Sequence, residues 1–390
     1  MLGILAVNIA GFAGPTQATL SPHVPLSGSP ADEAAFALIF MVFEGKMRAL
    51  FTLLFGASML LFVERAEAAG RNGAALQYRR LGWLLLFGLL HYLLLWWGDI
   101  LFLYAAIGLL ALRFRRADPH ALAAAAQLLF AGWHGLGAIS AQPGVTIEEQ
   151  VRTGAARPAL VARHTSEAAD AHAASERELE RYRAPFLAQI KDKILHRPFW
   201  QLRMTLFNFG ETFPLMLIGM ALYRSGFFSG AWPRRCLRLL AGGGLALGLI
   251  PTLAVLSWVW PRHFPTHAMS AAINYWTALP HLTMALAYAA LLMLAAPRLL
   301  KTRLGQRIEA AGRMAFSNYL GTTLVMTAIF YGWGLGLIGT VGAADQLLFV
   351  ALGWVLMLGW SKPWLSQFRQ GPLEWLWRSL TEVRRLAFRR

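Results

Sequence analysis

The chain has 390 residues, of which 57% are hydrophobic and 14% are charged, and its formal net charge is +16. Apolar runs of about 20 residues recur from end to end, which excludes an ordinary soluble domain. Because the runs do not alternate, and because a span in lipid must satisfy its own backbone hydrogen bonds, we expect helices instead of barrel strands. The single cysteine, Cys236, excludes an internal disulfide and any cysteine-based metal site.

The chain begins with an apolar run, 1–12, that is shorter than the roughly 17 residues needed to cross a bilayer. No basic stretch precedes it, as one would in a signal peptide, so we interpret it as a clipped first span with Asn8 near its middle. The loop 13–34 is rich in Pro, Gly and Ser, lacks Lys and Arg, and contains His23. We expect this loop to lie outside the cytoplasm.

Three charges, Glu44, Lys46 and Arg48, open the apolar run 43–62 that forms the second span. An ionisable group at membrane depth costs a few kcal/mol or more and marks a functional site by default. Glu44 and Arg48 are one helical turn apart, so they can pair while Lys46 points elsewhere. The alternative is that all three charges lie at the headgroup level, with the two cations snorkelling outward.

Eight further apolar segments complete the predicted membrane domain: 81–97, 100–112, 120–141, 199–223, 237–260, 271–296, 314–338 and 346–360. On one side, the four segments that join them and the C-terminal tail together contain 23 Lys and Arg, whereas the four short loops on the other side contain only Arg262. Lys and Arg concentrate in cytoplasmic loops. We therefore predict an all-α polytopic transmembrane bundle of about ten spans with both termini in the cytoplasm.

This reading divides the chain into four parts. Residues 1–141 form an N-terminal transmembrane half, 142–198 an extracytoplasmic, mostly helical polar segment, 199–360 a C-terminal transmembrane half, and 361–390 a basic cytoplasmic tail with an amphipathic helix. The end of the polar segment has apolar residues on one side, which fits a helix lying on the membrane surface. The positive charge is explained by topology, so we expect no nucleic-acid partner.

His91 and Asp99 bracket the outer end of the third and fourth spans. Asp99 suits the cap of the fourth helix, and a direct contact with His91 requires the turn to fold back. A buried His is often only a satisfied polar group, but His is also the commonest general base near neutral pH. Both interpretations of His91 stay open at this point.

Glu211 lies in the sixth span, three residues after Asn208. A carboxyl group there needs a proton or a cationic partner, for which Arg203, Lys46 and Arg48 are candidates.

Arg313 precedes an unusually polar opening turn of the ninth span, which contains Asn318. This turn is equally typical of a ligand site and of hydrogen bonds between helices. Arg378 lies in the tail helix, where Trp375 and Trp377 should rest at the inner interface. The ten His show no two-His spacing beside a carboxylate, so we predict no metal site.

Four stretches, Phe43–Gly56, His91–Ile100, Gly312–Tyr319 and Gly371–Arg378, resemble the YeiB-like family of bacterial inner-membrane proteins, whose function is unknown. The resemblance runs nearly end to end, although the family's first span usually opens with an Arg-Gly pair that this chain lacks. The early spans are similar to those of the heparan-type glucosamine acetyltransferases and the acyltransferase-3 proteins, which move acyl groups from cytoplasmic acyl-CoA to acceptors beyond the membrane. The resemblance implies a bacterial inner-membrane location and an Asn8 that faces a central cavity. It also points to His23, although its spacing from Asn8 differs from that in the acetyltransferases.

The first expected function is acyl transfer, with acyl-CoA as co-substrate and its phosphates held by Arg residues of the basic loops. A base at the outer mouth then activates the acceptor, and Asn8 polarises the thioester carbonyl. The candidate catalytic residues are Asn8, Glu44, His91 and Asp99. The candidate substrate-binding residues are His23, Lys46, Arg48, Glu211, Arg313, Asn318 and Arg378.

The second expected function is transport of a small anionic or zwitterionic solute, with Lys46 and Arg48 as anion contacts and Glu211 as a proton carrier. The halves of the chain share no motif repeat, which disfavours this alternative. A third alternative is a scaffold that holds an envelope partner through 142–198. We expect the lipid bilayer and a small molecule as partners, and the sequence leaves a homodimer open. All of these functions lead us to expect that the scarce polar side chains of separate spans, among them Asn8, Glu44, His91 and Glu211, converge on one internal chamber and do not face lipid.

Overall fold

The computed structural model describes all 390 residues, and it contains helices and no β-sheet, as predicted. The helices are α1 (Leu2–Ala13), α2 (Pro30–Val42), α3 (Lys46–Ala68), α4 (Gly73–Leu94), α5 (Leu101–Ala111), α6 (Pro119–Arg152), α7 (Pro158–Arg183), α8 (Phe186–His196), α9 (Trp200–Phe207), α10 (Phe209–Arg224), α11 (Arg234–Val259), α12 (Thr266–Ala271), α13 (Ala278–Leu299), α14 (Arg303–Arg313), α15 (Ala315–Phe330), α16 (Ala343–Gln367) and α17 (Pro372–Glu382). A π-helix, Ala272–Trp276, joins α12 to α13.

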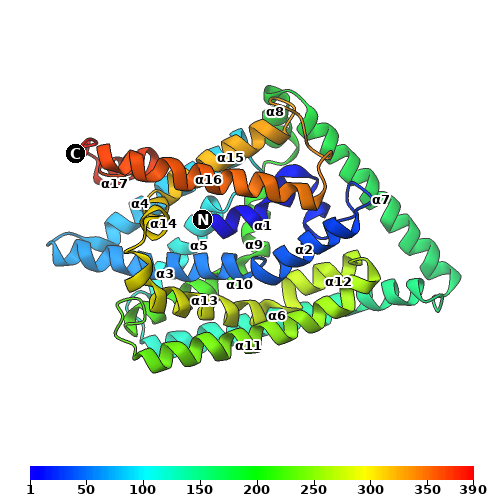
Figure 1. The fold of residues 1–390 in the computed structure, drawn as a ribbon, viewed down its shortest axis with the longest axis horizontal. Helices are drawn as coiled ribbons and strands as arrows, with labels where there is room; N and C mark the ends of the chain where they lie inside the picture. The colour runs from blue at the N-terminus through cyan, green and yellow to red at the C-terminus, as the bar shows by residue number, and fades with distance from the viewer.

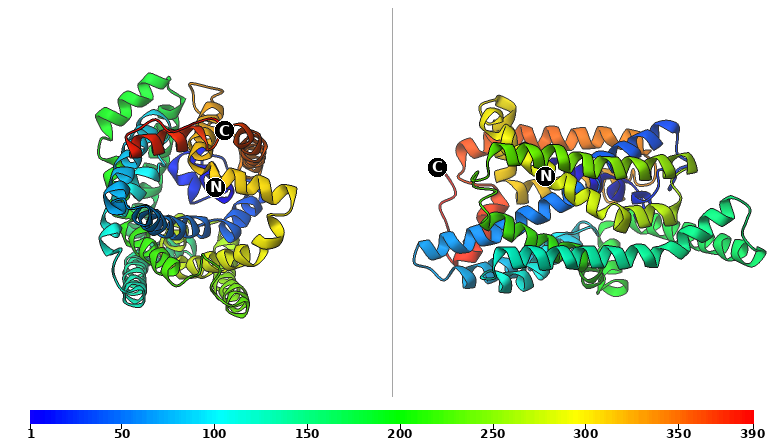
Figure 2. Two further views of the ribbon diagram at one scale, coloured as in Figure 1. Left: turned by 90° about the vertical axis from the view of Figure 1, so that its left-hand side faces the viewer. Right: turned by 90° about the horizontal axis from the view of Figure 1, so that it is seen from below.

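The long helices lie side by side along the long axis of the molecule (Figure 1). Viewed along that axis, the short helix α1 lies in the middle of the bundle and the longer helices surround it (Figure 2). The end of α6 and the helix α7 project beyond the bundle at one end, and α17 and the C-terminus lie at the other. The residues of α1 are therefore placed to line internal cavities.

Five segments are long and apolar enough to cross a membrane: Pro30–Ala68, Pro119–Arg152, Arg234–Arg262, Ala278–Leu299 and Ala343–Gln367. The pair α9 and α10, bent by 63° at its break, makes a sixth if it is taken as one span. Three shorter apolar helices, α1, α5 and α15, accompany them. The chain is thus a membrane protein with transmembrane helices, and the count of ten spans stays a prediction.

Several predicted boundaries differ from the structure, and the ninth predicted span, 314–338, runs past the end of α15 at Phe330. The fifth predicted span ends at residue 141, but α6 continues to Arg152, because the polar residues that follow still favour a helix until Gly154, whose φ of +72° ends it. The last predicted span ends at residue 360, whereas α16 continues to Gln367. In both places the helix is longer than its apolar run, so the polar segment and the tail begin inside helices.

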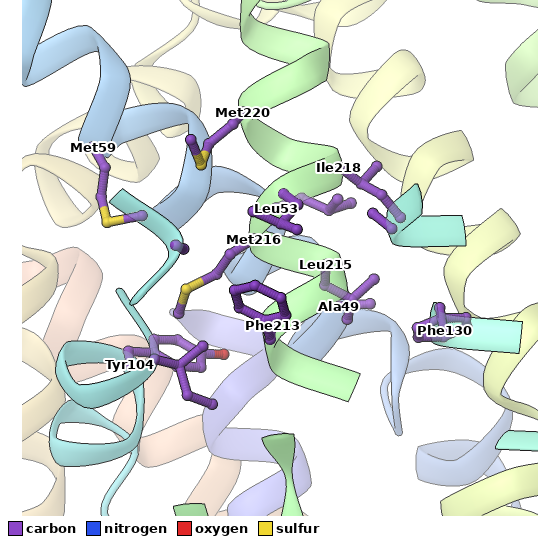
Figure 3. Close-up of a cluster of buried hydrophobic side chains, with 14 of the residues drawn as sticks. Ala49, Leu53, Met59, Tyr104, Phe130, Phe213, Leu215, Met216, Ile218 and Met220 are labelled. Carbon is purple, nitrogen blue, oxygen red and sulfur yellow. The ribbon is translucent and has the colours of Figure 1, made fainter. Parts of the chain in front are cut away.

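The main hydrophobic cluster joins α3 and α10, and Figure 3 shows Leu53 of α3 among side chains of α10 such as Met216. Two glycines set this close packing. A Cβ on Gly56 would lie 2.1 Å from the carbonyl oxygen of Met216, and one on Gly219 would lie 2.1 Å from that of Leu53. Small residues at both positions let the two backbones touch, which is how helices associate in lipid.

The helices α11 and α13 pack in the same way. A Cβ on Gly248 would lie 2.5 Å from the carbonyl oxygen of Pro280, and one on Gly244 would lie 2.7 Å from that of Thr283. The interpretation of these two glycines as close-packing positions is therefore confirmed.

The helix α8 carries its apolar residues outward, as a helix on a membrane surface would. Leu187 and Leu195 are each 70% exposed, whereas Gln189 and Lys193 are buried against the bundle. This reversed pattern is typical of a helix whose outer face meets lipid.

Candidate functional site

The three-charge segment does not open a continuous helix, because a break at Glu44 and Gly45 separates α2 from α3. Gly45 has a φ of +70°, which favours glycine. A Cβ at this position would also lie 1.9 Å from Nδ1 of His281, so the close approach of α13 independently requires glycine. The break places Glu44 beside the start of α3.

Glu44, Arg48 and Glu211 form one ion-pair network (the central triad). Nη1 of Arg48 lies 3.2 Å from Oε1 of Glu44, and Nε of Arg48 lies 2.9 Å from Oε1 of Glu211. The predicted pair of Glu44 and Arg48 is confirmed, and Arg48 is the cationic partner of Glu211. Lys46 is buried and points elsewhere, as predicted, since its Nζ donates to the carbonyl oxygen of Phe40 at 2.7 Å.

Three helix breaks meet at the central triad. Glu44 precedes α3, Glu211 lies in the first turn of α10 just after the 63° bend, and His281 lies in the first turn of α13 after the π-helix. Arg48, Glu211 and His281 line one small cavity, with about 240 Å³ of space between atoms. The positive ends of helices stabilise carboxylates near their first turns.

A larger cavity (the α1 cavity) lies on the other side of Glu44, with about 640 Å³ of space between atoms, part of it open to solvent. Its wall is mostly apolar and includes Ala6, Val7 and Ala10 of α1 and five residues of the following loop: Ser21, Pro22, Val24, Pro25 and Leu26. Glu44 is the only charged residue among the 19 that line it. A mostly apolar pocket with few polar groups is the usual form of a small-molecule site.

Asn8 lies on a different face of α1 and lines a separate cavity of about 260 Å³ together with Asn318 and Tyr319. Asn318 is buried, and its side chain donates to the carbonyl oxygen of Ala311 and accepts from Trp360. The polar turn of α15 is thus used in hydrogen bonds between helices, one of its two predicted roles. The expectation of one chamber shared by Asn8, Glu44, His91 and Glu211 is wrong. Asn8 and Glu44 line cavities on different faces of α1, Glu211 lines the small cavity beside His281, and His91 lines none of the three.

His91 and Asp99 are in direct contact, because the turn between α4 and α5 folds back. Nδ1 of His91 lies 2.8 Å from Oδ1 of Asp99, and both side chains are fully enclosed. The second carboxylate oxygen of Asp99 accepts from the backbone N–H of Phe102 at 2.7 Å, which confirms the predicted capping role. Nε2 of His91 has no hydrogen-bond partner. The ring of Tyr319 packs 5.1 Å from that of His91, centre to centre, and Tyr319 also lines the Asn8 cavity.

Arg313 and Arg378 contact neither the central triad nor any cavity described above. Arg313 is exposed at the end of α14, and Arg378 donates to the side chain of Gln370 in the tail. Glu374, from the same tail helix, was missed by sequence analysis, although it accepts from the backbone N–H groups of Phe316 and Ser317 at 2.7 and 3.0 Å. The tail therefore caps α15, a contact for which the sequence carries no local signal.

His23 lies at the other end of the bundle and contacts two residues that sequence analysis also missed. Its Nε2 is 2.9 Å from Oε1 of Glu33, and Nδ1 of His263 is 2.8 Å from the same oxygen. The absence of a metal site was predicted from sequence spacing, but the fold brings two His and a carboxylate together from distant segments. His23 is not near Asn8 or Glu44 in any cavity wall.

Sequence comparisons find relatives that align with nearly the whole chain. Residues 222–384 match a family described as "Protein of unknown function (DUF418)". The chain is 30% identical to the uncharacterized protein YeiB of Escherichia coli, over 98% of this chain and 93% of that protein. It is 31% identical to the uncharacterized protein YxaH of Bacillus subtilis, over 98% of this chain and 91% of that one. No solved structure matches the chain.

Proposed function

This chain belongs to the YeiB-like family, and from that premise we propose that it is a membrane-embedded acyltransferase whose Glu44 accepts a proton from the acceptor. The acyl group comes from cytoplasmic acyl-CoA, and the acceptor enters the α1 cavity from the opposite side. The reaction class follows the expectation from sequence that the early spans are similar to those of membrane acyltransferases.

The observation that carries the proposal is the position of Glu44. It is the only charged group in the wall of the α1 cavity, and its carboxylate is held by Arg48 at 3.2 Å. Arg48 is itself fixed by Glu211 at 2.9 Å. A carboxylate oriented by a second and a third charged group has the preorganisation that general-base catalysis needs.

The proposed reaction is a direct transfer. The Glu44 carboxylate takes the proton of an acceptor hydroxyl or amine as that oxygen or nitrogen attacks the thioester carbonyl carbon. The carbon–sulfur bond then breaks, the CoA thiolate leaves, and Glu44 returns the proton to the sulfur. The start of α3 next to Glu44 supplies the positive end of a helix, which stabilises negative charge on the carbonyl oxygen in the transition state.

We also propose that the protein lies in the bacterial inner membrane with both termini in the cytoplasm. The distribution of Lys and Arg supports this orientation. Contacts among the basic segments support it too: Arg79 donates to the carbonyl oxygen of Thr381, and Arg224 donates to that of Ala117 at 2.6 Å. The predicted cytoplasmic loops and the tail thus adjoin each other at one end, where arginines are available for the phosphates of acyl-CoA.

Two other groups remain candidates within this reaction. His91 is oriented by Asp99, and its free Nε2 has the arrangement of a base. Asn8 lines the neighbouring cavity, which helix α1 separates from Glu44, so in this structure it lies away from the proposed proton transfer. Because neither residue lines the α1 cavity, the proposal assigns the first proton transfer to Glu44.

Transport of a small solute is the second candidate, and the three helix breaks at the central triad favour it. Discontinuous helices with charged residues at their broken ends are how many secondary transporters build a binding site. In this reading Glu211 carries a proton and Arg48 contacts the solute.

The test uses the purified full-length protein with labelled acetyl-CoA, in detergent and in vesicles made from its own lipid extract. Acyl transfer predicts label on a lipid-extract or soluble acceptor, or slow release of CoA, and Glu44→Gln abolishes both. Glu67→Gln, an exposed carboxylate near the end of α3, is the matched control and retains both. A failure to bind CoA under any condition would contradict the acyltransferase proposal. Solute uptake that depends on Glu211 would support transport instead.

A further inference from the structure

A cluster of His23, Glu33 and His263 (the outer triad) lies at the end of the bundle opposite the tail. The three candidate ligand atoms, Nε2 of His23, Oε1 of Glu33 and Nδ1 of His263, all lie within 4.8 Å of one another. His23 comes from the loop before α2, Glu33 from the first turn of α2, and His263 from the turn after α11. Both loops belong to the predicted extracytoplasmic side.

The hydrogen bonds of His23 leave two acceptor atoms facing each other, one on His23 and one on Glu33. Nδ1 lies 2.7 Å from the carbonyl oxygen of Ser27, which only accepts, so Nδ1 carries a proton. In the neutral ring, Nε2 then has a lone pair, and it faces a carboxylate oxygen of Glu33 at 2.9 Å. Two acceptors facing each other need a cation between them, either a second proton on the ring or a metal ion.

We propose that the outer triad binds a divalent transition-metal ion, Zn²⁺ by its donor set. Two imidazoles and one carboxylate are the ligands of zinc sites that keep an open position. In a tetrahedral site with bonds of about 2.0–2.2 Å, neighbouring ligand atoms lie about 3.3 Å apart. The observed separations from Glu33, 2.8 and 2.9 Å, need to widen by only a few tenths of an ångström.

The hydrogen bonds that orient the candidate ligands are also typical of a metal site. Metal-binding His side chains usually donate their other N–H to a backbone carbonyl, as His23 does to Ser27. The second oxygen of Glu33 accepts from the indole N–H of Trp260 at 3.0 Å, which fixes the carboxylate. Neither contact uses the ligand atoms themselves.

The backbone at His263 is strained in a way that presents its ring to the triad. His263 and Phe264 have φ values of +56° and +54°, an unusual conformation for two successive residues with side chains. Phe264 is buried and packs edge-on against Phe36, which holds the turn. His263 itself is 76% exposed, so an ion reaches the triad from solvent.

The outer triad adjoins a polar cleft, of which His23 forms part of the wall. The cleft has about 1160 Å³ of space between atoms, part of it open to solvent, and its other lining residues include Glu148, His164, Glu167, His172 and His267. An ion held by His23 therefore has its open position available to water or to an anionic oxygen of a ligand in the cleft. The proposal does not rest on acyl transfer or transport.

The test measures metal uptake by the full-length protein after removal of metal with a chelator. Zn²⁺ is titrated calorimetrically, and Co²⁺ is used as a spectroscopic probe because its visible absorption reports tetrahedral coordination. The wild-type chain binds one ion, and His263→Ala or His23→Gln weakens binding tenfold or more. His267→Ala, an exposed His of the neighbouring cleft, is the matched control and keeps the wild-type affinity.

Thermal unfolding of each variant checks that it folds, and the exposed His263 makes its substitution the safer of the two. The proposal is overturned if the wild-type chain takes up no ion, in which case the outer triad is an imidazolium–carboxylate pair. It is equally overturned if His263→Ala, His23→Gln and His267→Ala lose the same affinity, since the ion then belongs to the cleft.

Discussion

Nε of Arg48 in α3 lies 2.9 Å from Oε1 of Glu211 in α10, although 163 positions separate the two residues in the chain. The same guanidinium reaches Glu44 at 3.2 Å, one turn earlier in the chain. Arg48 therefore ties the break between α2 and α3 to the break between α9 and α10. Two carboxylates and one arginine carry one net negative charge, so the central triad depends on its cation.

Replacing Arg48 with Gln should destabilise the protein by about 2 kcal/mol, between the values for exposed and for fully buried ion pairs. The reason is that two partly buried carboxylates lose their shared partner. Thermal unfolding in detergent measures the effect. The double variant Arg48→Gln with Glu211→Gln should lose less unfolding free energy than the sum of the losses in the two single variants. A loss equal to that sum would show that the two residues do not interact.

Gly219→Ala should destabilise the contact between α3 and α10, because its methyl group would meet the carbonyl oxygen of Leu53. Overpacking of this kind costs about 1–3 kcal/mol. Gly82→Ala, in α4, is the control, since nothing lies within 4 Å of its added Cβ. Equal unfolding temperatures for Gly219→Ala and Gly82→Ala would contradict the close packing described here.

Lys193 should make stability depend on pH. Its burial against the bundle, together with nearby Arg197, lowers the pKa of the ammonium group to about 7 from its ordinary value of 10.5. Between these two values the unfolded chain binds one more proton than the folded chain, so folding stability rises with pH across that window. The slope contributed by this group is up to about 1.4 kcal/mol per pH unit.

The variant Lys193→Met isolates this effect. It keeps most of the side-chain volume and removes the proton, so it should be more stable than the wild type at pH 7, with a difference that shrinks towards pH 10. Chemical unfolding of both proteins across this range gives the difference directly. A difference that is constant from pH 7 to pH 10 would mean that Lys193 is charged in the folded protein.

Asp99→Asn separates the two roles of that carboxylate. Asn keeps an oxygen for the N–H of Phe102, so the start of α5 should survive, but it no longer holds His91 through a charged acceptor. We expect a loss of about 1–3 kcal/mol from the buried pair. If His91 also acts as a base, Asp99→Asn lowers the rate of acyl transfer even under conditions where the variant is fully folded. An unchanged rate in Asp99→Asn restricts His91 to a structural role.

Composition and local spacing are enough to predict the helical fold and several contacts. The apolar runs locate most helices, the four-residue separation of Glu44 and Arg48 gives their pair, and Gly244 and Gly248 indicate a close helix contact. All of these depend on residues near one another in sequence. The physical reason is that helix formation and pairing across one turn are local.

The neighbours of each helix could not be predicted in the same way. Every apolar helix is equally compatible with lipid, so hydropathy does not say that α3 meets α10 or that α1 lies in the middle of the bundle. The pair of Arg48 and Glu211, the outer triad and the separation of Asn8 from Glu44 all follow from that arrangement. The single shared chamber failed as a prediction for this reason.

The rate of CoA release from acetyl-CoA by Glu44→Gln is the most direct test of the central claim, that a carboxylate fixed by Arg48 performs the proton transfer. The substitution keeps an oxygen for Arg48 and removes the negative charge together with the capacity to accept a proton. We predict that acceptor-dependent release falls to background in Glu44→Gln and stays at the wild-type rate in Glu67→Gln. Wild-type release by a correctly folded Glu44→Gln protein would contradict the claim.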